Sequence, residues 1–96
     1  FKDNVKPLEG CLDKVCQMRG VSYTWNEQSQ KEGVEDIGVI AQEMAQIYPE
    51  VVTEVDGLNG RDPHLTVDYA RLTAVLINAV KELRQEVEEL KNGAPI

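Results

Sequence analysis

The stretch that decides the fold runs from Asp68 to Asn92 and reads DYARLTAVLINAVKELRQEVEELKN. It contains no Pro or Gly, and its apolar residues recur with the period of an α-helix. We therefore predict one unbroken helix, which Asp68 caps at its start and which Gly93 and Pro95 bring to an end.

Part of this apolar pattern repeats every seven residues, as it does in a coiled coil. β-branched residues take the a positions of the heptad, and leucines take the d positions. The predicted seam consists of Thr73, Leu76, Val80, Leu83, Val87 and Leu90. Glu86 at a g position and Lys91 at the next e position suit pairing between parallel helices. Valine at a with leucine at d suits dimers as well as trimers, so the heptads leave the number of helices open.

A helix with this pattern can also pack on the core of a monomer. Leu72, Val75 and Ile77 widen the apolar face in its first half, whereas polar residues surround a narrow seam after Lys81. We therefore expect the first half to pack on its own domain and the second half to project as a coiled coil. So short a seam is marginal alone, and the rest of the domain must help to hold the helices together.

Length and charge restrict the function classes. The 96 residues suffice for one domain, or for one piece of a larger chain, and a net charge of −7 argues against nucleic acid and anionic membranes as partners. No apolar run approaches a membrane span, and the charged N-terminus lacks the apolar region of a signal peptide. Cys11 and Cys16 would point about 140° apart on one helix, so we expect buried, reduced thiols and synthesis in a cytoplasm. With His64 as the single histidine, neither a metal nor another cofactor is expected.

The remaining elements follow from shorter patterns. Helices are predicted at residues 8–18 and 42–48, and strands at 21–25, 37–40, 51–55 and 65–67. Val21, Tyr23 and Trp25 should face inward on the first strand, and Met44 should be buried on the second helix. The turn-rich segment 56–63 joins the last two strands, whereas segment 26–35 is either a hairpin loop or a disordered linker.

This order of elements predicts the α+β class, with a small mixed helix and strand domain that resembles a winged helix. The globular part would span residues 1–67, the C-terminal helix of the same domain 68–92, and a tail 93–96. A winged-helix protein that reads DNA is the weakest functional interpretation, because the charge is acidic and no helix is basic.

Three motifs occur in the order of a known family. They are IGVIAQEM at residues 37–44, YPEVV at 48–52 and VDYARLTAVLI at 67–77, followed by the rest of the long helix. Together they resemble the C-terminal intramolecular chaperone auto-processing domain that closes phage tailspikes, tail fibres and neck appendages, with a relative in the myelin regulatory factor. The resemblance covers nearly the whole chain.

The resemblance implies a parallel homotrimer whose C-terminal helices form a coiled coil. Such a domain directs the folding of the β-rich fibre upstream in the same polypeptide and is then released by cutting the peptide bond before a serine. The sequence FKDNV at residues 1–5 matches the end of the family's cleavage motif, so Lys2 falls on its catalytic lysine and Asn4 on its asparagine. The serine would lie five residues before Lys2, outside this sequence, and the chain as given should be inactive. The precursor would be made in the host cytoplasm and belong to the virion.

The implied chemistry is coherent. A serine hydroxyl attacks well only when a base takes its proton, and a lysine is such a base only when it is neutral. Desolvation by Phe1, Val5 and adjacent chains would favour that neutral form. The alternative function is a trimerisation or adhesion tip of a fibre that is never cleaved, and a serine five residues before Lys2 in the parent gene would distinguish the two.

Overall fold

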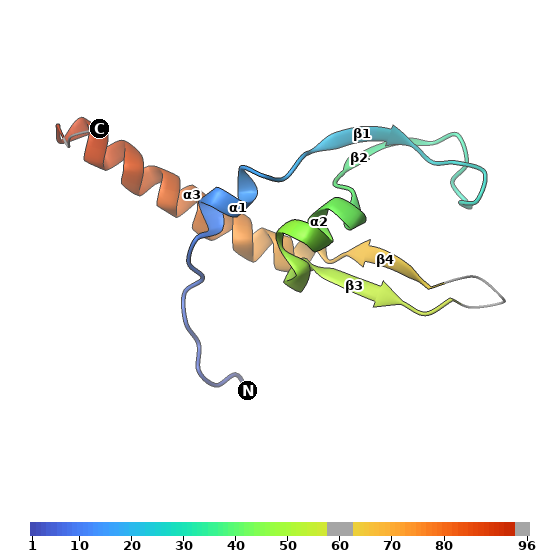
Figure 1. Ribbon diagram of the computed structural model, residues 1–96, viewed down its shortest axis with the longest axis horizontal. Helices are drawn as coiled ribbons and strands as arrows, with labels where there is room; N and C mark the ends of the chain where they lie inside the picture. The colour runs from blue at the N-terminus through green and yellow to red at the C-terminus, as the bar shows by residue number, and fades with distance from the viewer. Residues whose placement is uncertain (58–62, 94–96) are drawn as a thin grey trace. The chain divides into compact units, whose positions relative to one another are not determined.

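The computed structural model describes residues 1–57 and 63–93 and confirms a small mixed α+β chain with two small sheets and a long C-terminal helix (Figure 1). In chain order the elements are α1 (Cys11–Val15), β1 (Val21–Thr24), β2 (Glu35–Gly38), α2 (Ala41–Ile47), the 3-10 helix η1 (Pro49–Val51), β3 (Val52–Val55), β4 (His64–Val67) and α3 (Tyr69–Lys91). These elements form two compact units, one of Phe1–Gln17 with Tyr69–Ile96 and one of Met18–Asp68. The winged-helix likeness, the trimeric coiled coil and the domain boundary at residue 67 stay predictions.

The long helix α3 runs from Tyr69 to Lys91, which confirms the helix predicted at 68–92. It ends at Gly93, whose φ of 74° is the left-handed conformation that glycine adopts most readily. The Gly93 N–H donates to the Leu90 carbonyl at 3.1 Å and so satisfies one of the last helical acceptors. Capping by Asp68 stays a prediction, and Pro95 lies outside the described residues.

The short helix α1 lies alongside α3 (Figure 1). The buried face of α3 consists of Leu72, Val75 and Ala79, and Cys11 on α1 is fully buried. The predicted burial of Leu72 and Val75 is therefore confirmed. Ile77, predicted to widen this face, is instead 54% exposed, because it lies on nearly the opposite side of the helix from the buried face.

Helix α1 is shorter than the helix predicted at 8–18. It begins only at Cys11, because Gly10 before it has a φ of 69°, which lies outside the right-handed helical region. Five residues are too few for a helix that is stable alone, so α1 depends on α3 for its stability. Cys16 follows the last turn and is exposed, so its predicted burial is wrong, whereas that of Cys11 is right.

Strands β1 and β2 form an antiparallel hairpin in which Val21 pairs with Gly38 and Tyr23 with Asp36. The predicted alternation is confirmed, with Val21, Tyr23 and Trp25 half-buried. The second strand begins two residues earlier than predicted and ends at Gly38, because Ile40 already precedes α2 as its N-cap. Two backbone hydrogen bonds of 2.9 Å, from Trp25 to Val34 and from Gly33 to Trp25, close the loop, which favours the hairpin over a linker.

Strands β3 and β4 form the second hairpin, with Val52 paired to Val67. Helix α2 contacts both strands, and Met44 and Val51 are each only 1% exposed. The predicted burial of Met44 is therefore confirmed. Strand β4 begins at the exposed His64, one residue before the strand predicted at 65–67, and residues 58–62 of the predicted loop 56–63 lie outside the described part of the chain.

We expect Met44→Ala to destabilise the unit Met18–Asp68 by about 2–5 kcal/mol, because it leaves a cavity at a fully buried position. Met44→Leu nearly conserves the volume and should cost less than about 1.5 kcal/mol. Urea unfolding followed by the fluorescence of Trp25, the single tryptophan, measures both. Equal losses in the two variants would contradict the packing described for α2.

The Asp36 carboxylate accepts hydrogen bonds from the Ile37 N–H at 2.8 Å and from the Trp25 indole at 3.3 Å. These two bonds, the one from Ile37 first, and the nearby charge of Lys31 lower the pKa of Asp36. A lowered pKa stabilises the folded state at pH values above about 3.9, the pKa of an aspartate in the unfolded chain. This stabilisation is lost as the pH falls through the pKa of Asp36 in the folded state.

We therefore expect the Trp25 indole N–H resonance to titrate with a midpoint below about 3.9 in an NMR pH series, because protonation of Asp36 weakens the bond that the indole donates. Asp36→Asn should abolish this step, whereas the control Glu35→Gln, at the exposed neighbouring residue, should leave it in place. A step that survives Asp36→Asn would assign the titration to another group.

Candidate functional site

The predicted seam forms an exposed apolar strip along α3. Its side chains are between 38% and 65% exposed, and they belong to Leu76, Val80, Leu83, Val87 and Leu90. At about 100° per residue, the centre of the strip lies about 70° around the helix from the centre of the buried face, so the two faces are adjacent but distinct. Thr73 continues the strip toward the start of the helix and is also exposed, and its hydroxyl donates to the Tyr69 carbonyl at 2.9 Å.

The strip is unusually apolar for a surface in contact with water. Monomeric proteins seldom expose a large contiguous apolar patch, and such patches mark interaction surfaces. Arg84 and Glu86 take the e and g positions on either side of the strip, and Arg84 pairs with Glu88 at 3.3 Å. The apolar row therefore has the form of a helix-pairing surface bordered by charged residues.

Lys2 and Asn4 lie in the N-terminal segment, outside any helix or strand, and both are exposed. Phe1 and Val5 are exposed as well, so within one chain they do not cover Lys2. Asn4 has a φ of 56°, a left-handed conformation that asparagine tolerates better than most residues. The backbone therefore changes direction two residues after Lys2.

Glu82 connects the start of α1 to α3, a contact that was not predicted from the sequence. Its carboxylate accepts hydrogen bonds from the N–H groups of Gly10 at 3.1 Å, Cys11 at 2.8 Å and Leu12 at 3.0 Å. N–H groups at the start of a helix have no acceptor within their own helix. Because about 70 residues separate Glu82 from these donors, no local sequence pattern announces the contact.

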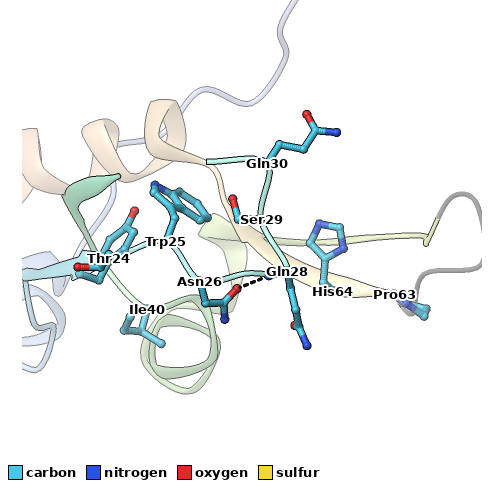
Figure 2. A pocket seen from close by; sticks show the side chains of 10 residues that line it. Thr24, Trp25, Asn26, Gln28, Ser29, Gln30, Ile40, Pro63 and His64 are labelled. Atoms are coloured by element: carbon cyan, nitrogen blue, oxygen red, sulfur yellow. Dashed lines mark hydrogen bonds between the residues drawn. The ribbon is translucent and has the colours of Figure 1, made fainter. Parts of the chain in front are cut away.

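A hollow of about 950 Å³ lies in the unit Met18–Asp68 (Figure 2). It is lined by Tyr23, Thr24, Trp25, Asn26, Gln28, Ser29, Gln30, Ile40, Pro63 and His64. Asn26 shapes the loop beside it, since its side-chain oxygen accepts from the Gln28 N–H at 3.0 Å (Figure 2). None of the residues predicted to act in cleavage or assembly lines this hollow.

Metal-binding and membrane-spanning arrangements are absent from the described ranges 1–57 and 63–93. No group of three His, Cys, Asp or Glu side chains there is placed to hold a metal ion. Within the same ranges, no helix has both the length and the apolar composition needed to cross a membrane.

Comparison with known proteins agrees with the predicted family. Residues 1–53 match the family described as the chaperone of endosialidase. The long tail fiber protein Gp37 of Enterobacteria phages K3 and T2 is 38% identical over 93 residues, which cover 96% of this chain and 7% of those proteins. Gp37 of Enterobacteria phage Ox2 is 36% identical over 94 residues, covering 95% of this chain and 37% of that protein, so the chain spans only a small part of these relatives. This chain belongs to the chaperone-of-endosialidase family, a family of self-cleaving peptidase domains that occurs in phage tail fibre proteins.

Proposed function

We propose that this chain is the C-terminal intramolecular chaperone of a phage tail fibre, tailspike or appendage protein. It brings three copies together, directs the folding of the β-rich fibre upstream, and is then released by self-cleavage. The observation that carries this proposal is the exposed strip on α3, from Leu76 to Leu90, in a chain of this family.

Assembly through α3 would give three parallel helices. Each strip buries its valines and leucines against the other two, which removes apolar surface from water. In this arrangement Glu86 of one chain lies near Lys91 of a neighbour, a pairing that favours the parallel register. Once the helices are joined, the upstream segments of the three chains are held at high local concentration, which favours their correct alignment.

Cleavage would follow from the same assembly. A serine five residues before Lys2 supplies the nucleophile, and Lys2 in its neutral form takes the proton from the serine hydroxyl. Phe1 and Val5, exposed in the single chain, are available to cover Lys2 when the chains come together. Since the serine remains on one product, each chain cuts once.

We expect Leu83→Lys with Val87→Lys to yield monomers, because charged side chains at the seam cannot be buried without a partner. The control, Gln85→Lys with Asn92→Lys, adds the same charge at exposed positions away from the seam and should leave the assembly intact. Light scattering gives the mass of each variant. A trimer that persists in the seam variant would refute the role assigned to this strip.

The cleavage proposal is tested on the longer protein that includes the residues encoded before Phe1. Lys2→Ala should slow self-cleavage by about 10²–10⁴-fold, the usual contribution of a general base. Lys6→Ala, at another exposed lysine of the same segment, should cleave like the parent. Intact mass spectrometry over time measures the products. If the parent and both variants all remain full-length, the cleavage proposal is wrong and the chain is a fibre tip that is never cleaved. If all three are cut, another base or a host protease is responsible.

A further inference from the structure

We propose that Glu82 is a positioning residue for self-cleavage, which couples the assembled helix α3 to the segment that carries Lys2. This inference rests on the proposed function. In this role Glu82 does more than stabilise the fold. It holds the start of α1 on α3, and this fixes the point from which the segment that carries Lys2 extends.

The contact uses both oxygens of the Glu82 carboxylate. One oxygen accepts from Gly10, and the other accepts from Cys11 and Leu12. Gly10, the N-cap of α1, has no side chain that could accept these bonds itself. A negative charge at this end of a helix is also favoured by the helix dipole.

Without Glu82, three N–H groups at the start of α1 would lose this acceptor. A helix of five residues cannot replace that loss by its own stability. We therefore expect α1 to detach more often from α3, and Cys11, which is fully buried beside these bonds, to become accessible.

Glu82 shares a helical turn with two seam residues, Val80 and Leu83, but lies on a different face of α3. Assembly along the seam would therefore fix this turn and, through Glu82, the start of α1, without placing the carboxylate in the seam. From Gly10 back to Lys2 the chain spans eight residues, which reach at most about 28 Å. Neighbouring helices in a bundle lie about 8–10 Å apart, so this anchored segment keeps Lys2 within reach of all three chains.

The chain offers a matched control for Glu82. Glu89 lies seven residues later, at the same heptad position, and its carboxylate accepts from Gln85 on its own helix at 3.3 Å. Glu82→Ala and Glu89→Ala therefore change charge and helix propensity equally, but only the first removes the bonds to α1. Glu82→Gln retains one acceptor oxygen and should lie between Glu82→Ala and the parent.

The experiment uses the longer protein in a Cys16→Ser background, which leaves Cys11 as the thiol reporter in this domain. Three quantities are measured for each variant: the mass of the assembly, the rate at which a thiol reagent labels Cys11, and the rate of self-cleavage. We expect Glu82→Ala to remain trimeric, to label Cys11 at least about ten times faster and to cleave at least about ten times more slowly, which is the effect of losing roughly 1.4 kcal/mol or more. Glu89→Ala should behave like the parent in all three measurements.

Several outcomes would overturn the inference. Exposure of Cys11 with cleavage at the parent's rate would show that the bonds to α1 are structural only. Loss of the trimer would show that Glu82 acts on assembly rather than on positioning, and protection of Cys11 would show that the contact does not hold α1. A parent that never cleaves, with Cys11 exposed in Glu82→Ala, would instead refute the proposed cleavage and leave the contact as a structural one.

Discussion

Helix α3 carries two distinct apolar faces, and the rest of the chain covers only one of them. One face buries Leu72, Val75 and Ala79 on a helix that α1 contacts, and the other exposes the leucines and valines of the heptads. Because the centres of the faces lie about 70° apart, the same helix can hold its own N-terminal segment and still present an apolar strip to other chains. A helix whose single apolar face was already covered by α1 would have no such strip left.

Glu82 links the N-terminal segment to α3. Its carboxylate binds the start of α1, and it lies in the same helical turn as Val80 and Leu83 of the strip. The arrangement joins residues from opposite ends of the chain, so the segment near Lys2 is tied to the helix proposed to assemble. In the proposed function, this link makes the timing of cleavage depend on assembly.

The unit Met18–Asp68 is built differently, from two hairpins and a short helix. Met44 and Val51 are fully buried there, and the hydrogen bond from Trp25 to Asp36 braces the first hairpin. Its open hollow is lined by aromatic and polar side chains, and neither Lys2 nor the strip on α3 contributes to that lining. The hollow therefore provides no support for the proposed function, which rests on the family match and on the strip.

Local patterns in the sequence were enough to specify α3, its heptad strip, the alternation of β1, the burial of Met44 and the resemblance to the family. Each of these depends on spacing between near neighbours, which the chain carries locally. The tertiary structure was needed to establish three further features. They are the late start of α1, the exposure of Ile77 and Cys16, and the contact of Glu82 with α1. These features depend on which distant segment covers a given face, and contacts across about 70 residues leave no periodic trace in the sequence.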